Sequence, residues 1–292
     1  MKKNMIYNLT ILMVTIFLIS CKKDKTDSGL KSVFSYVADG YKVNFTNFST
    51  GATEYNWNFG DNSGVNLTST VKTPQHIFTA KGDYLVSLTV KNGSESNTFK
   101  DTVSILGPNI KIDGDFSDWQ YVDYLYENPT TYSSTVSAVK AYASSKDINF
   151  YFEGSLGMNM DIIDIYMDAD NNPATGFSTY LYPAGSGADV LCEGKPRPST
   201  DAAGFGDIFT HSGAPSAFSW SPVFTFAGAM NISEIKTKAN KKIIEFSIKK
   251  TALGPIANKV KFALVESTSG YAEIGKIPVP VLPTSKFLTI NL

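Results

Sequence analysis

The stretch Val136–Gly154, VSAVKAYASSKDINFYFEG, decides the fold class of the longer part of this chain. Apolar and polar side chains alternate on both sides of Ser145-Lys146-Asp147, a pattern typical of two half-buried strands joined by a turn. Similar runs follow, including MDIIDIYMDA, ADVLCEG, SPVFTFAG, KKIIEFSIKK and KVKFALVES, and one helical turn is expected at Lys250-Thr-Ala-Leu253. About nine such strands with no long helical period predict one jelly-roll β-sandwich over residues 108–292.

Residues 33–105 also alternate with period two, in short runs separated by Gly, Asn and Asp. This spacing predicts an antiparallel β-sandwich of immunoglobulin size, so the whole chain is expected to be all-β. Three motifs, YNWNFGD (55–61), PQHIF (74–78) and GDYLVSLTV (82–90), resemble the PKD domain in sequence and order. The resemblance implies that residues 32–107 form a PKD domain, with Trp57 in its core and Tyr84 pinning a strand. A sugar-stacking role for Trp57 is the alternative.

The N-terminus combines Lys2 and Lys3 with the apolar run LTILMVTIFLIS and then Cys21. The run is too short to span a bilayer and is typical of a signal peptide, predicted over residues 1–20. Its ending resembles a bacterial lipoprotein signal, which implies a lipid on Cys21 and a membrane anchor. Residues 21–31 are charged and apolar-poor, as in a flexible tether. We therefore expect a lipid-anchored envelope protein of the outer membrane, facing outward; an ordinary secretory signal is the alternative.

Composition excludes several classes of function. The net charge is −1 with acids and bases interspersed, so nucleic acid is not an expected partner. With Cys21 lipidated, Cys192 has no disulfide partner, and the two isolated histidines favour no zinc site. The sequence has no Gly-x-Ser-x-Gly elbow or phosphate loop, and we predict no catalytic residue.

Several blocks of the second domain resemble the family 9 carbohydrate-binding modules. They are IKIDGDFSDW, VKAYASSKDINFYFEG, IYMDADNNPATGF, GADVLCEG and IIEFSIKKTALG followed by KVKFALVE, in the order of the family. The resemblance implies glycan binding and a structural calcium ion. In the first block, Asp113, Asp115 and Asp118 are expected to cap turns rather than bind a ligand, and Trp119 to plug the sandwich.

The loop DADNNPATG (168–176) is a candidate calcium site. Asp168, Asp170 and Asn172 alternate, and could direct three hard oxygen atoms to one centre, with Asp189 or Glu193 from the next strand completing it. An EF-hand is excluded, because its glycine and glutamate positions hold Pro173 and Thr179. The alternative is a polar turn whose side chains cap free backbone N–H groups.

A glycan site needs aromatic faces for the CH-rich face of a sugar and polar groups for its hydroxyls. The candidates in predicted loops are Tyr180, Tyr182, Trp220 and Tyr271, together with Phe205 and Phe209. Arg197, the only arginine, lies in a proline-bounded loop and could bind a hydroxyl or carboxylate with two N–H groups. Packing of the loops is the alternative role for each ring.

These patterns together predict a tethered protein whose second domain binds carbohydrate, with the PKD-like domain as a spacer. One alternative is a structural or adhesive lipoprotein that binds an envelope protein. The other is a glycan-active enzyme, which requires two suitably spaced carboxylates.

Overall fold

The computed structural model describes residues 29–61, 66–198 and 205–292 of the 292-residue chain. The predicted signal peptide, the predicted lipidation site Cys21 and most of the predicted tether lie outside the described residues. Within these ranges, no helix is both long and apolar enough to cross a bilayer.

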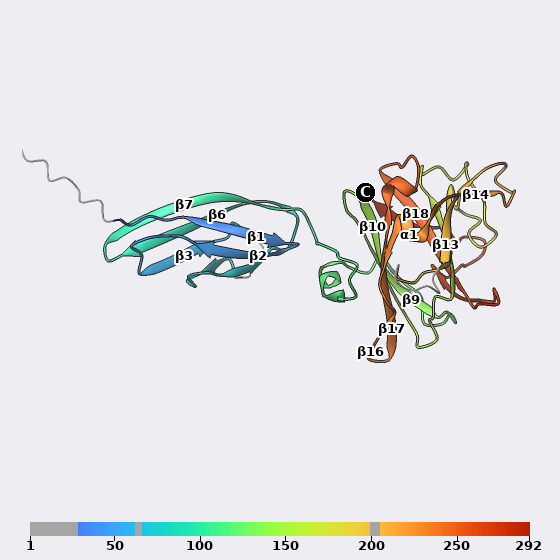
Figure 1. Ribbon diagram of the computed structural model, residues 1–292, viewed down its shortest axis with the longest axis horizontal. Helices are drawn as coiled ribbons and strands as arrows, with labels where there is room; N and C mark the ends of the chain where they lie inside the picture. The colour runs from blue at the N-terminus through green and yellow to red at the C-terminus, as the bar shows by residue number, and fades with distance from the viewer. Residues whose placement is uncertain (1–28, 62–65, 199–204) are drawn as a thin grey trace, which may run out of the picture. The chain divides into compact units, whose positions relative to one another are not determined.

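The chain divides by its internal contacts into two compact units, and the second takes in 36–44 and 75–84 as well as 103–292. The hydrogen-bonded sheets separate more simply. In the described chain, no strand of residues 34–105 pairs with a strand of residues 126–291 (Figure 1). We therefore describe the two sets of sheets separately.

The N-terminal strands form the immunoglobulin-like sandwich that the sequence predicts. One sheet has the order β1 (Phe34–Asp39), β2 (Lys42–Asn47), β5 (Gln75–Ile77). The other has the order β4 (Thr68–Ser69), β3 (Glu54–Asn58), β6 (Gly82–Asn92), β7 (Glu95–Ile105).

Trp57 of β3 lies in the core of this sandwich. Its side chain is fully buried, and its ring centroid lies 5.1 Å from that of Phe34 and 5.2 Å from that of Phe45. Its Nε1–H donates to the Val71 carbonyl oxygen at 2.9 Å. Both ring faces are therefore used in packing, which leaves none for a sugar.

The second domain is the predicted jelly-roll-like pair of sheets. Its six-stranded sheet has the order β15 (Met230–Ile232), β17 (Lys241–Lys249), β10 (Asp147–Gly154), β9 (Val136–Ala143), β8 (Tyr126–Glu127), with β16 (Lys236–Lys238) also paired to β17. Its seven-stranded sheet has the order β14 (Trp220–Thr225), β13 (Phe205–His211), β12 (Val190–Lys195), β11 (Ile162–Asp168), β18 (Lys259–Ser267), β19 (Glu273–Ile277), with β20 (Leu288–Asn291) also paired to β18.

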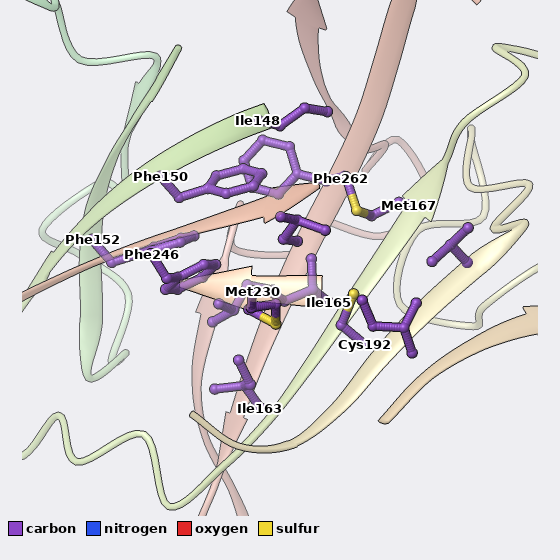
Figure 2. Packing of buried hydrophobic residues seen from close by; sticks show 14 of the residues in the cluster. Ile148, Phe150, Phe152, Ile163, Ile165, Met167, Cys192, Met230, Phe246 and Phe262 are labelled. Atoms are coloured by element: carbon purple, nitrogen blue, oxygen red, sulfur yellow. The ribbon is translucent and has the colours of Figure 1, made fainter. Parts of the chain in front are cut away.

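Aromatic and aliphatic side chains fill the space between these two sheets (Figure 2). The ring of Phe150 in β10 lies 5.5 Å from that of Phe246 in β17 and 4.9 Å from that of Phe262 in β18, so it bridges the sheets. Cys192 of β12 is fully buried in the same cluster, and burial raises the pKa of its thiol to about 12. The thiol is thus neutral and packs as a small apolar side chain.

The segment IDGDFSDW covers the outside of the six-stranded sheet through structural contacts. Trp119 of the short 3-10 helix η1 (Phe116–Tyr121) is buried, and its Nε1–H donates to Glu245 Oε2 at 2.8 Å. Asp115 accepts the Ser117 N–H at 3.1 Å, and Asp118 accepts the Lys111 N–H at 2.7 Å. The aspartates therefore serve the backbone, as the sequence predicts.

Two segments differ from the sequence-based expectation. The predicted strand SPVFTFAG ends at Thr225 and continues as a helical turn, α1 (Phe226–Ala229), because the Thr225 hydroxyl caps the Gly228 N–H at 3.2 Å. A second short 3-10 helix, η2 (Lys250–Ala252), occupies the predicted helical turn. Phe205 and Phe209, expected in a loop, lie on β13.

Candidate functional site

Three carboxylates lie side by side on the outer face of the seven-stranded sheet, the face turned away from the core. Asp164 of β11 is directly opposite Glu193 of β12, and Glu193 is directly opposite Asp207 of β13. Residues that face each other in antiparallel strands share one side of the sheet, with Cβ atoms about 4.5–5.5 Å apart. The strand neighbours of Asp164, Ile163 and Ile165, point into the core. We call Asp164, Glu193 and Asp207 the carboxylate row.

The carboxylate row is electrostatically unusual. Burial, together with the nearby Glu193 and Glu273, raises the pKa of Asp164 to about 7. Burial also raises the pKa of Glu193. Among the described residues, none provides a hydrogen bond or an ion pair to the three side-chain carboxylates. They are therefore free to accept hydrogen bonds from a ligand.

Aromatic rings lie beside the carboxylate row on the same face. Two residues further along each strand, Tyr166 is opposite Leu191, and Leu191 is opposite Phe209. Tyr180 is 71% exposed, and its hydroxyl donates to Glu273 Oε1 at 3.0 Å. The outer face thus combines acceptor groups with flat apolar surfaces.

A cleft of about 690 Å³ opens over the β12–β13 end of this face. Glu193 and Asp207 line it together with Phe209, Arg197 and Tyr271. The structure therefore brings two of the predicted ligand-binding residues, Arg197 and Tyr271, to one cleft with two members of the carboxylate row.

Arg197 and Tyr271 differ in how firmly they are held. The Arg197 guanidinium lies 3.7 Å from Asp161 Oδ1 and donates to the Asn159 carbonyl oxygen at 3.4 Å. Tyr271 is 68% exposed and has a φ of 62°, in the left-handed region, which turns its ring out of the β18–β19 connection. The guanidinium is thus oriented by the fold, whereas the tyrosine ring projects into solvent.

Two other predicted aromatic residues, Tyr182 and Trp220, do not line this cleft. Tyr182 is fully buried, its ring packs against Phe287, and its hydroxyl donates to the Pro278 carbonyl oxygen at 2.6 Å, so it has no face for a ligand. Trp220 packs within an aromatic cluster, with its ring centroid 5.0 Å from that of His211 and 5.8 Å from that of Phe177. The structure provides no acceptor for its buried indole N–H among the described residues.

The candidate calcium loop brings three carboxylates together. Oxygen atoms of Asp168, Asp170 and Asp189 all lie within 4.8 Å of one another. The Asn172 side chain instead accepts the Ala174 N–H at 3.2 Å and closes the turn. Glu193, the other predicted ligand, is opposite Asp164 rather than Asp168.

Hydrogen bonds within the loop already engage most of these oxygen atoms. Asp168 accepts the Lys261 ammonium at 2.8 Å and the Asn172 N–H at 3.0 Å. Asp189 Oδ2 accepts the N–H groups of Ala169 and Asp170 at 3.0 and 3.2 Å. Burial raises the pKa of Asp168, although Lys261 opposes this shift. The oxygen donor set suits a hard cation, which would compete with the Lys261 ammonium.

Comparison with known proteins identifies the N-terminal segment. Residues 35–106 match the family model of the PKD domain. The PKD1 domain of Vibrio anguillarum Epp is 29% identical over 27% of this chain and 94% of that chain, with a TM-score of 0.24. The PKD1 domain of the Vibrio cholerae metalloprotease PrtV is 29% identical over 25% of this chain and 93% of that chain, with a TM-score of 0.23.

The second domain also has a solved structural neighbour. A family 9 carbohydrate-binding module from Caldicellulosiruptor kristjanssonii, in complex with cellotriose, is 14% identical over 57% of this chain and 77% of that chain, with a TM-score of 0.33. No curated protein matches the sequence significantly.

Proposed function

We propose that the second domain binds carbohydrate in the cleft over its seven-stranded sheet, with the PKD domain as a spacer. The observation that carries the proposal is the carboxylate row. Its three acceptor groups have no hydrogen-bond partner among the described residues, and two of them line a cleft that also has aromatic walls. Its volume of about 690 Å³ is in the range of about 300–1,000 Å³ common for small-molecule sites. The resemblance of the sequence to family 9 carbohydrate-binding modules supports the same class of ligand.

The chemistry of binding follows from the side chains that line the cleft. Glu193 and Asp207 accept hydrogen bonds from sugar hydroxyls, and the Arg197 guanidinium donates to hydroxyl or ring oxygen atoms. The rings of Phe209 and Tyr271 offer flat surfaces for the CH-rich face of a pyranose. Each of these contacts would hold and orient a bound sugar, and we propose binding without turnover as the primary function.

A glycan array probed with the soluble fragment from Lys31 onward tests this function. We expect signal on at least one class of neutral or acidic glycan, and Glu193→Gln with Asp207→Asn to weaken it more than tenfold. Glu127→Gln, an exposed carboxylate on the six-stranded sheet, is the matched control and should bind as the parent does. An array without signal under any condition would refute carbohydrate binding and favour a protein partner.

A glycan-active enzyme is the second candidate, and one observation favours it. Asp164, with a pKa of about 7, lies directly opposite Glu193, so a carboxyl group that can hold its proton near neutral pH has a second carboxyl group as its neighbour. Glycoside hydrolysis uses such a pair. Turnover of a bound glycan that is abolished by Asp164→Asn would establish this activity.

We propose that calcium binds at Asp168, Asp170 and Asp189 and fixes the loop without touching the ligand. The cluster of three carboxylates supports the proposal, because the one ion pair that it forms within the described residues is that of Asp168 with Lys261. Backbone carbonyls and water would supply the remaining oxygen ligands that calcium requires.

We also propose that the protein is anchored in the cell envelope, at the outer membrane and facing outward, by a lipid on Cys21. The support is the sequence of residues 1–27 alone, with its basic start, short apolar run, Leu-x-Ser-Cys ending and charged segment after the cysteine.

A further inference from the structure

A second cleft lies on the opposite side of the second domain, on the outer face of the six-stranded sheet. It has a volume of about 560 Å³ and is lined by η1, by β9 and β10, and by the hairpin of β16 and β17. None of the residues that line it belongs to the cleft over the seven-stranded sheet, which we call the glycan cleft. We call it the lysine cleft.

The charge of the lysine cleft comes from Lys140, Lys238 and Lys241, against the single carboxylate of Glu153. Lys241 forms an ion pair with Glu153, and the hydroxyls of Tyr124 and Tyr151 donate to the same carboxylate at 3.0 and 3.3 Å. Burial would raise the pKa of Glu153, but these partners outweigh it and lower the pKa. Glu153 is therefore ionised and already neutralised by Lys241.

Two ammonium groups, those of Lys140 and Lys238, form no ion pair with a carboxylate of the described residues. Lys140 donates to the Trp119 carbonyl oxygen at 2.9 Å, and its Nζ lies 4.7 Å from the centroid of the Tyr124 ring. These are neutral partners. Burial lowers the pKa of Lys140, and the nearby carboxylates of Asp123 and Glu153, which form no ion pair with it, oppose this shift. Lys238, on the exposed hairpin, has no hydrogen-bond or ion-pair partner in the described part of the chain. An anion in the cleft would offset the desolvation of the Lys140 ammonium and would form an ion pair with Lys238.

The rest of the lining suits a hydroxylated ring. Tyr124 is 41% exposed and offers an aromatic wall, and Phe116 adds a second apolar surface. The amide groups of Gln120 and Asn240 and the hydroxyl of Ser117 are polar groups that can donate or accept hydrogen bonds.

We propose that the lysine cleft is a second binding site, for an acidic saccharide whose pyranose ring carries a carboxylate. The carboxylate pairs with Lys238 and Lys140, the ring lies against Tyr124, and the hydroxyls bond to Gln120 and Asn240. This site is independent of the glycan cleft, and its existence does not require that the first cleft bind any sugar.

Calorimetric titration of the full chain in detergent tests this site, with trigalacturonate as the probe and the neutral trisaccharide of the same linkage as its match. We expect trigalacturonate to bind at least tenfold more tightly, and an increase in salt from 50 to 500 mM to weaken it, because exposed charge pairs are screened. Equal affinity for the acidic and neutral trisaccharides, or no binding of either, would overturn the proposal.

Two charge-reversal variants locate the binding. Lys238→Glu should weaken trigalacturonate about fivefold or more, in line with the loss of an exposed ion pair and the gain of a repulsion. Lys259→Glu, an exposed lysine on the other sheet, makes the same charge change and should stay within twofold of the parent. Glu193→Gln separates the two sites. If Glu193→Gln loses trigalacturonate binding and Lys238→Glu keeps it, the ligand binds in the glycan cleft and the second site is refuted.

Discussion

Glu245 joins two segments that are distant in sequence. Its carboxylate is fully buried on β17, accepts the N–H groups of Asp113 and Gly114 at 3.1 and 2.7 Å, and accepts the Trp119 indole N–H. Glu245→Ala leaves these three donors without an acceptor, including the buried Trp119 indole N–H, and we expect the free energy of unfolding to fall by about 3 kcal/mol. Urea denaturation measures it, with the exposed Glu127→Ala expected within about 0.5 kcal/mol of the parent.

Asp164 gives the second domain a pH-dependent stability. Its pKa of about 7 in the folded protein exceeds the ordinary value of 3.8, so the folded state holds the proton more tightly than the unfolded state. The free energy of unfolding should therefore fall as the pH rises from about 4 to 7, and level off above. Asp164→Asn should remove this pH-dependent fall in the free energy of unfolding.

Thermal melting across this pH range measures the effect of Asp164. We expect Asp164→Asn to melt about 2–4 °C above the parent at pH 8 and at the same temperature near pH 4. The exposed Glu95→Gln should follow the parent at every pH. A variant that melts below the parent at pH 8 would show that the carboxylate is stabilising rather than strained.

At the level of single residues, burial could be predicted for side chains on regular strands but not for side chains in irregular segments. The core role of Trp57 and Cys192 follows from their positions in alternating strands, and the structure agrees. Tyr182 lies in an irregular segment, where no period indicates which way a side chain points, and it is buried. Asp164, in the middle of IIDIY, was the available signal for the carboxylate row, because an acid in an apolar strand marks its outer face.

The strands were predicted where alternation is regular, as in β9, β10, β11, β17 and β18. β13 was missed because FGDIF combines glycine with exposed aromatic residues, as loops also do. Pairing was not predictable: Asp164, Glu193 and Asp207 meet only because antiparallel register sets them opposite one another, and no local pattern contains that register. The fold class could therefore be read from the sequence, but the carboxylate row could not.

The pairing of β12 with β13 depends on Gly194. It has a φ of 150°, and a Cβ there would lie 2.3 Å from the Gly206 Cα on the facing strand. We expect Gly194→Ala to lower the free energy of unfolding by about 2 kcal/mol or more, and to disturb the glycan cleft, which both glycines line. Gly270→Ala, where the nearest atom lies 3.8 Å away, should change neither; chemical denaturation compares the two.

The loop between β11 and β12 tests the proposed calcium ion. At a free Ca²⁺ concentration one hundred times Kd, binding adds about 2.7 kcal/mol, so excess chelator should lower the melting temperature by about 5–10 °C. Asp170→Asn, at an exposed position of the cluster, should remove most of this response while the protein still folds. An unchanged melting temperature in chelator would identify the loop as a polar turn held by Lys261.

For the whole molecule, our proposals assign ligand binding to the second of the described domains and the location of the protein to the first residues of the sequence. A lipid on Cys21 would hold the protein on a membrane, because several acyl chains give a stable anchor whereas one chain is marginal. Residues 22–28, KKDKTDS, are charged and would keep the first sheet clear of the bilayer surface. We therefore expect that loss of the anchor leaves glycan binding unchanged.

Cys21→Ser tests this separation. The variant lacks the thiol that receives the lipid, and we expect it to move from the membrane fraction to the soluble fraction after cell lysis. Its glycan array should match that of the parent, because both proposed clefts lie within residues 112–271. Cys192→Ser is the matched control: it changes a buried thiol, and the folded fraction should remain with the membrane. If Cys21→Ser stays membrane-bound, the anchor is not a lipid on this cysteine, and the N-terminal segment acts in another way.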